Sequence, residues 1–361
     1  MRAFARENRG YLWWLAGLAA FFAVYFPLRT CRAAMNWLCG HVILPLEQAL
    51  GRLCGLTAVS VAEVLILTGI YAVLFWLAWQ VRCLITRAGR RKRLLRMALT
   101  AVNVTLSIYA GFCLLWGVFY GADSFQDKSG LQARGGTVEE LTALTERFAD
   151  QVSALSVAVP RDGFGRFAVP RAKIFDDALT AYDGILAEFD FLQRPAVAPK
   201  AFVSSRGMSY LDFSGFYFPF TGEANLNDES PACYLPANIC HELAHQQGIA
   251  AEQECNFVAI LAATGHEGAA YRYSGYLMGY VHLANALYRT DHDAWQTIRD
   301  SLPDTVRTDL AWNSAYWAQF DGPVNTAATK VYDGFLKSNG LTDGVQNYGT
   351  VVDLLLAYYY E

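Results

Sequence analysis

The sequence predicts an α-helical membrane anchor with three transmembrane helices, followed by a mostly helical α+β domain that contains a small sheet. Long apolar runs, each close to the ~20 residues that cross a bilayer, occur within residues 1–120. The net charge changes sign near residue 120, where these apolar runs end. Residues 1–120 contain 13 Lys and Arg against 3 Asp and Glu, whereas residues 121–361 contain 16 against 30. Beyond the boundary, apolar residues recur mostly with helical spacing.

The predicted spans are Tyr11–Leu28, Thr57–Gln80 and Met97–Tyr120. Trp and Tyr residues lie near their ends, as is usual where a helix meets the membrane surface. The basic residues before the first span would also suit a signal peptide, but no small-residue cleavage site follows it, so we expect the span to be retained. Residues 33–56 are interrupted by Pro45 and several glycines, and we expect a re-entrant or interfacial segment there.

The loop predicted between the second and third spans, residues 82–96, contains seven basic residues and no acid. Loops of this kind stay in the cytoplasm, so three spans place the C-terminal domain on the outer side of the membrane. The acidic balance of residues 121–361 argues against nucleic-acid binding and leaves the lipid bilayer as the expected partner of the anchor.

Residues 121–136 contain Gly, Asp and Ser and predict a linker. Thr137 and Glu140 have the spacing of a capping box, which predicts that the first helix of the soluble domain begins there. The domain is therefore expected over residues 137–361, a length sufficient to bury its own core.

Within this domain, apolar residues with helical period predict an amphipathic helix over about 172–192. Aromatic and β-branched content, with turn residues on either side, predicts strands at Ala201–Ser205 and Leu211–Phe220. Helices are expected to dominate from there to the end of the chain.

Residues 241–245 have the sequence His-Glu-Leu-Ala-His, an HExxH motif. On a helix, His241 and His245 project from one face and can hold one zinc ion at about 2.0–2.1 Å. Glu242 then lies where it can act as general base on a zinc-bound water, whose pKa the metal lowers toward about 7. Pro236 before the motif and Gly248 after it predict the start and the end of the required helix. The alternative is a buried structural helix whose two histidines satisfy each other or the backbone.

Glu252 is the expected third zinc ligand, because it precedes Asn256 by one helical turn. The amide of Asn256 could then hydrogen-bond a ligating histidine and fix the orientation of its ring. Glu254 is the alternative ligand, on the opposite side of the same helix. Either carboxylate could instead simply stabilise the N-terminus of that helix.

The order of His241, Glu242, His245, Glu252 and Asn256 resembles the gluzincin pattern, HExxH followed by ExxxD or ExxxN, with an unusually short spacer before the second part. A longer likeness covers most of the chain. The motif region, the three hydrophobic segments, and the stretches 215–225, 331–337 and 343–349 together resemble the uncharacterised bacterial family catalogued as domain of unknown function 3810. The resemblance implies a membrane-anchored zinc peptidase with a zincin-like soluble domain in the bacterial cell membrane. It implies no particular substrate.

A zinc peptidase also needs an edge strand that pairs with the substrate and a hydrogen-bond donor for the oxyanion. By analogy, Phe216–Phe220 is the candidate strand and Thr221–Asn225 is expected to shape the cleft, although the aromatic side chains suit a core equally well. The individual candidates for the cleft or the oxyanion donor are Tyr217, Glu223, Tyr273, Tyr276 and His282.

The predicted function is therefore that of a membrane-tethered zinc metallopeptidase that hydrolyses peptide bonds of a peptide or protein substrate, with Zn²⁺ as cofactor. A non-catalytic zinc-binding envelope module is the alternative of a different class. A zinc amidase that acts on cell-wall peptides is a variant of the first function. The presence of Glu242 favours catalysis, because a purely structural zinc site needs no general base.

Overall fold

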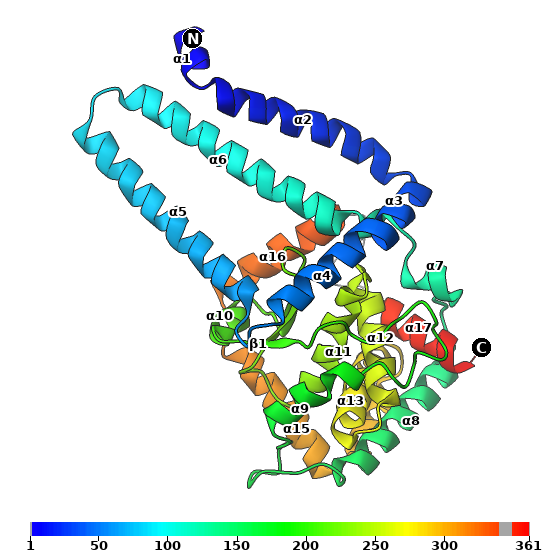
Figure 1. Ribbon diagram of the computed structural model, residues 1–361. Helices are drawn as coiled ribbons and strands as arrows, with labels where there is room; N and C mark the ends of the chain where they lie inside the picture. Colours follow the sequence, from blue (N-terminus) through cyan, green and yellow to red (C-terminus); the bar gives the residue numbers. More distant parts are fainter. Residues whose placement is uncertain (1, 339–348, 361) are drawn as a thin grey trace.

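The computed structural model describes residues 2–338 and 349–360 and shows three long helices that project from a mostly helical body (Figure 1). In the described residues, three helices are long and apolar enough to cross a membrane, as predicted. They are α2 (Arg9–Arg29), α5 (Val61–Thr86) and the continuous helix Arg90–Gly117, which consists of α6 (Arg90–Phe112) and a π-helical turn (Cys113–Gly117). A short helix, α1 (Arg2–Glu7), precedes them.

The apolar side chains of these helices face outward on almost every side; Phe75 of α5, for example, is 73% exposed. A helix that is apolar all round buries its surface in lipid, since water would not tolerate so large an apolar area. The structure therefore supports membrane association.

The predicted loop at residues 82–96 differs in the structure. α5 continues through Thr86 and α6 begins at Arg90, so that only residues 87–89 connect them. Gly89 has a φ angle of +83°, which glycine adopts without steric cost, and this permits the tight reversal. The basic residues extend the two helices because Arg and Lys are good helix formers.

Residues 33–56 form α3 (Arg32–Leu38), a π-helical turn (Cys39–Ile43) and α4 (Leu44–Cys54). α4 crosses between the long helices and the body (Figure 1), and its Glu47 and Gly51 are buried. Gly222, in the turn after the second strand, packs against the backbone of both residues with a φ angle of +66°. A re-entrant or interfacial placement of this segment stays a prediction.

Gly222→Ala is expected to destabilise the protein. The left-handed backbone alone costs a residue with a Cβ atom about 1–2 kcal/mol, and the added carbon would collide with the carbonyl oxygen of Glu47. Thermal unfolding in detergent should show a clear fall in Tm. Gly207→Ala is the control, because a Cβ atom there meets nothing within 4 Å. An equal Tm for both variants would contradict the close packing of α4 on this turn.

Helices α7 to α17 form the body, and most of them contribute residues to one main hydrophobic core. Their bounds are α7 (Phe125–Ser129), α8 (Val138–Ser156), α9 (Arg171–Asp176), α10 (Ser205–Tyr210), α11 (Leu235–Gln246), α12 (Glu252–Gly265), α13 (Ala269–Thr290), α14 (His292–Ser301), α15 (Asp304–Ala318), α16 (Pro323–Ser338) and α17 (Gly349–Tyr360). α8 begins at the predicted capping box, in which the side chains of Thr137 and Glu140 each accept the other's backbone N–H. The predicted linker contains α7, which has a capping box of its own.

The predicted continuous helix over 172–192 is wrong. α9 ends at Asp176, a 3-10 turn covers Asp177–Thr180, and successive turns with mostly i to i+3 hydrogen bonds follow. These turns still bury a residue every three or four positions, which explains the helical periodicity in the sequence. Gly184 packs directly on the backbone of Gly265 at the end of α12.

The sheet has three strands in the order β1-β3-β2, namely β1 (Lys200–Phe202), β2 (Gly215–Phe218) and β3 (Glu223–Asn227). β1 is parallel to β3, and β2 is antiparallel to it. Both predicted strands exist in shortened form, whereas the central strand β3 was not predicted. Its sequence, Glu-Ala-Asn-Leu-Asn, is mostly polar, yet all five residues are buried because hydrogen bonds satisfy the polar side chains.

Two buried carboxylates fasten the start of α5 to this sheet. Glu223 of β3 accepts hydrogen bonds from the N–H groups of Val61 and Ala62 and pairs with Lys200 at 2.7 Å. In the opposite direction, Glu63 of α5 accepts from two backbone N–H groups just after β1, at 2.8 and 2.7 Å. Charged hydrogen bonds of this kind are strong, so the body and the long helix are held at one mutual position.

Candidate metal centre

The HExxH motif lies on α11, as predicted. Pro236 occupies the first turn of this helix, where its missing N–H costs nothing. After the helix, Gly248 adopts a φ angle of +82°, and its N–H bonds to the carbonyl of His245. This sharp turn allows the chain to return within six residues, so that α12 begins at Glu252 directly opposite the two histidines.

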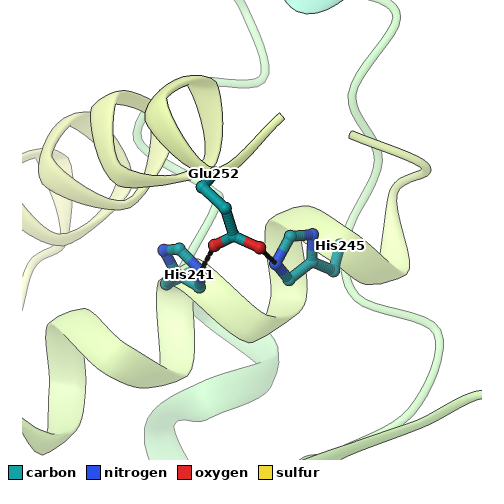
Figure 2. Close-up of side chains that lie close together, drawn as sticks. All are labelled: His241, His245 and Glu252. Atoms are coloured by element: carbon teal, nitrogen blue, oxygen red, sulfur yellow. Dashed lines mark hydrogen bonds and ion pairs between the residues drawn. The ribbon is translucent and has the colours of Figure 1, made fainter. Parts of the chain in front are cut away.

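Figure 2 shows the carboxylate of Glu252 between the imidazoles of His241 and His245. His241 Nε2 lies 3.1 Å from Glu252 Oε2, and His245 Nε2 lies 3.6 Å from Oε1. One ligand atom from each of the three residues falls within 4.8 Å of the others. The three side chains thus converge on one point from two adjacent helices.

The other ring nitrogen of each histidine is held by an oxygen acceptor. His241 Nδ1 lies 2.9 Å from Asn256 Oδ1, the contact predicted for that amide, and His245 Nδ1 lies 2.8 Å from the carbonyl of Ile249. An acceptor at Nδ1 keeps a proton on that nitrogen, so Nε2 is the atom that would bind a metal, which would displace the proton that Nε2 shares with Glu252 here. Both rings are therefore oriented as metal ligands require.

Glu252 is the acid that belongs to this cluster. Burial acts to raise the pKa of its carboxyl, but the two histidines outweigh burial and hold the pKa well below its usual range, so that an anionic ligand is available. Glu254 points elsewhere and accepts hydrogen bonds from the backbone N–H groups of Phe125 and Gln126, at the start of α7. The geometry therefore favours the first of the two predicted alternatives.

Glu242 lies beside the cluster and outside it. Its side chain is buried against Gly215 of β2, where a Cβ atom would collide with the carboxylate. Within the described residues its Oε2 has no hydrogen-bond partner. Burial raises the pKa of this carboxyl to about 7. A buried acid with an unpaired oxygen is expected where it serves a ligand or a reaction, since such an atom is otherwise costly.

A cavity of about 650 Å³ opens onto these residues. Of the predicted cleft candidates, Tyr217 and His282 line it. The Tyr217 hydroxyl donates to Glu47 at 3.2 Å, and burial together with the nearby His241 lowers the pKa of His282 to about 4, so that its imidazole is neutral at pH 7.

The other three candidates lie away from the cavity. Tyr273 is in the main core, where its hydroxyl donates to Asp309, and Tyr276 packs on the ring of Phe148. Glu223 accepts hydrogen bonds from the backbone at the start of α5, as described above. Tyr276 contacts Phe148 of α8, and Tyr273 stacks on Phe167, so the helical spacing of the two tyrosines reflects packing of α13.

Sequence reasoning missed Tyr332 of α16 as a site residue. Its hydroxyl donates to Glu252 Oε1 at 2.5 Å, and it lines the same cavity. Burial and the neighbouring carboxylate raise the pKa of this phenol well above its usual value, so it keeps its proton. The only signal in the sequence was its position in the family-like stretch 331–337, which gives no role.

The residues present fit a zinc ion. Two correctly oriented imidazole nitrogens and one carboxylate are the donor set of catalytic zinc sites, which leave the fourth position for water or substrate. Glu242 lines the same cavity as these ligands, where its carboxylate could contact that water.

Comparison with known families gives one result. The family model described as "Protein of unknown function (DUF3810)" matches residues 42–356. No curated protein and no solved structure matches the chain. The predicted likeness to this family is thus confirmed over residues 42–356, whereas the first predicted span, Tyr11–Leu28, lies outside the match. Of the stretches that suggested it, residues 343–348 lie outside the part of the chain that the structure describes.

Proposed function

We propose that this chain, which belongs to the DUF3810 family, is a membrane-attached zinc-dependent metallopeptidase. One observation carries the proposal: His241, His245 and Glu252 converge with metal-ligand geometry, and Glu242 lies next to them with a carboxylate oxygen that has no hydrogen-bond partner among the described residues. Ligands alone would suit a structural zinc site. The additional buried acid, in a cavity large enough for a peptide, favours hydrolysis.

Each residue has a defined task in this proposal. A zinc ion held by His241, His245 and Glu252 would polarise the substrate carbonyl and acidify water. Glu242 accepts a proton from the attacking water while the oxygen of that water bonds to the carbonyl carbon of the substrate. Glu242 then donates this proton to the amine nitrogen as the C–N bond breaks. Asn256 and the carbonyl of Ile249 keep the two imidazoles in position throughout.

Strand β2 supplies a binding edge for the substrate. It pairs with β3 on one side only, so in the described residues its other edge has no partner strand. Gly215 at its start touches Glu242, and Phe216 and Tyr217 line the cavity. An extended peptide that adds to this edge would pass directly beside the general base.

Tyr332 is the best-placed donor for the oxyanion among the described side chains that line the cavity. It is protonated, it is within hydrogen-bond reach of the proposed zinc ligand Glu252, and its hydroxyl could turn toward an oxygen bound at the same point. His282 is a second neutral donor in the wall of the cavity.

The experiment that tests the function compares new protein N-termini in cells that express the wild type or Glu242→Gln. Cleavage by this site should produce termini that are present with the wild type and absent with the variant. Identical sets of termini would contradict the peptidase and favour a zinc-binding envelope module. Loss of cell-wall peptide fragments without new protein termini would identify the amidase variant.

We also propose that the protein is a multi-pass component of a bacterial cell membrane with its C-terminal body outside. The basic residues at the turn between α5 and α6 resist translocation, which keeps that turn in the cytoplasm. Alkaline phosphatase fused to the C-terminus should therefore be active. The same reporter fused after Gly89 is the control and should be inactive, and the reverse pattern would overturn this orientation.

A further inference from the structure

We propose that the substrate of this site is a membrane-anchored polypeptide, cut in the extended segment where it leaves the bilayer, about three to six residues from the membrane. The inference rests on the proposed peptidase function and adds the class of substrate. Four features of the described residues support it: the wall of the cavity, the depth of that wall, the direction of β2 and the fixed position of the body.

The wall of the catalytic cavity includes the end of a membrane helix. Phe112 and Trp116, both within the candidate span Arg90–Gly117, line the same cavity as His241 and Glu242. The ring of Trp116 contacts the ring of His245 edge-on, with 5.4 Å between centroids. A side chain of the span itself, Trp116, therefore contacts one of the proposed zinc ligands directly.

We expect the part of the cavity wall that Phe112 and Trp116 form to lie at the level of the membrane surface. An apolar layer of about 30 Å takes about 20 helical residues, at about 1.5 Å each. Counted from Arg96, the last residue of the basic cluster, the layer ends near Trp116, a residue type that favours the interface. Phe112 lies about one turn deeper, in the hydrocarbon. The cavity therefore reaches the level of the lipid.

Strand β2 runs from the general base to the membrane helix. Gly215 at one end touches the carboxylate of Glu242. In the turn after the other end, the ring of Phe220 packs on Gly111 of α6, at the position where a Cβ atom would be. The strand itself covers about 10 Å, at about 3.3 Å per residue. A substrate strand added to its free edge would thus extend from the bilayer to the scissile bond over a few residues.

The body cannot move far from this position. Ala250, in the short connection between the two zinc-ligand helices, is buried in a hydrophobic cluster made mostly of residues from the membrane-anchor part, and Gly248 packs on Phe119. Glu63 and Glu223 fasten α5 to the sheet on another side. Since the cavity is held at one height, the distance from the membrane selects the bond that is cut.

An anchored substrate gains a further advantage from its tether. A polypeptide confined to the same membrane presents its juxtamembrane segment at a high effective concentration, which raises binding without any new contact. A soluble polypeptide lacks this gain and has to approach a cavity that lies against the lipid surface.

The experiment uses the full-length zinc-loaded protein in vesicles of phosphatidylethanolamine and phosphatidylglycerol. One probe is a library of single-span polypeptides, each with a 20-residue Leu/Ala span followed by about 30 randomised residues on the side of the catalytic body. The second probe is the same randomised segments without the span. Mass spectrometry maps the cut positions, and vesicles with Glu242→Gln give the background.

We expect cuts to concentrate about three to six residues from the span, and the library without the span to be cut at least about 10-fold more slowly. Cuts spread evenly along the randomised segment, or equal rates for the two libraries, would overturn the substrate class and leave the peptidase intact. Absence of any Glu242-dependent cut in either library would overturn the peptidase function and this inference with it.

Discussion

Glu242→Gln is expected to lower peptide hydrolysis by about 10²- to 10⁴-fold, the usual contribution of a general acid–base group, while the zinc content stays at the wild-type level. The amide of Gln is nearly the same size as the carboxylate, so it fits the same space against Gly215, but it cannot accept and return a proton. Glu242 also stands outside the cluster of His241, His245 and Glu252, so its loss removes no metal ligand. The measurements are turnover of a cleaved peptide and zinc per chain by elemental analysis.

Glu146→Gln is the matched control. It makes the same chemical change at an exposed residue of α8 that does not line the cavity. It should keep full activity and full zinc. If Glu242→Gln hydrolysed peptides at the wild-type rate, the proposed role of this residue would be wrong even with zinc bound. If the variant lost its zinc, Glu242 would have to be regarded as part of the metal site.

Features with a local cause were predictable from the sequence. The HExxH spacing, the Gly248 turn and the capping box at Thr137 each depend on residues within one or two helical turns, and the structure contains all three. The apolar helices were predictable for a similar reason, since a bilayer imposes a minimum length on every span. The contact between Asn256 and His241 followed from one helical turn of spacing after Glu252.

Features that depend on distant partners were not predictable. Strand β3 contains buried Glu and Asn side chains, which look like a loop until their partners on α5 and α10 are known. Tyr332 reaches Glu252 across 80 positions of sequence, and no local pattern marks it as a site residue. The turns after Asp176 repeat the burial spacing of a helix without its hydrogen bonds, so periodicity alone could not distinguish the two.

The short connection between α11 and α12 depends both on a local feature and on a contact with distant residues. Six residues separate His245 from Glu252, and they suffice because Gly248 reverses the chain and Ala250 rests on the membrane-anchor part. The helix that carries the proposed third ligand, Glu252, therefore begins shortly after a residue that packs on the anchor. The proposed metal centre and the apolar helices therefore belong to one packed structure, and we expect substitutions in the anchor to alter the proposed site.

Glu252→Gln is expected to reduce zinc affinity by at least about 10- to 100-fold. Loss of a residue that only supports a ligand already costs that much, and Gln removes a charged oxygen from the ligand set itself. Asn256→Ala should weaken zinc less, because His241 keeps its lone pair and loses only the partner that orients its ring. The measurement is competition for zinc against a chelator of known affinity.

Glu254→Gln is the matched partner of this test, two residues away on the same helix. Its carboxylate binds the backbone N–H groups at the start of α7, so the change should weaken that contact by about 1–3 kcal/mol and leave zinc affinity near the wild-type value. We therefore expect Glu254→Gln to have a lower Tm and full zinc content. Glu252→Gln should instead have a reduced zinc content. The opposite order, with zinc lost from Glu254→Gln and kept in Glu252→Gln, would move the third ligand by two residues. That result would also contradict the proposed role of Asn256, which lies one turn beyond Glu252. The proposed arrangement of α11 and α12 around the metal would then be wrong.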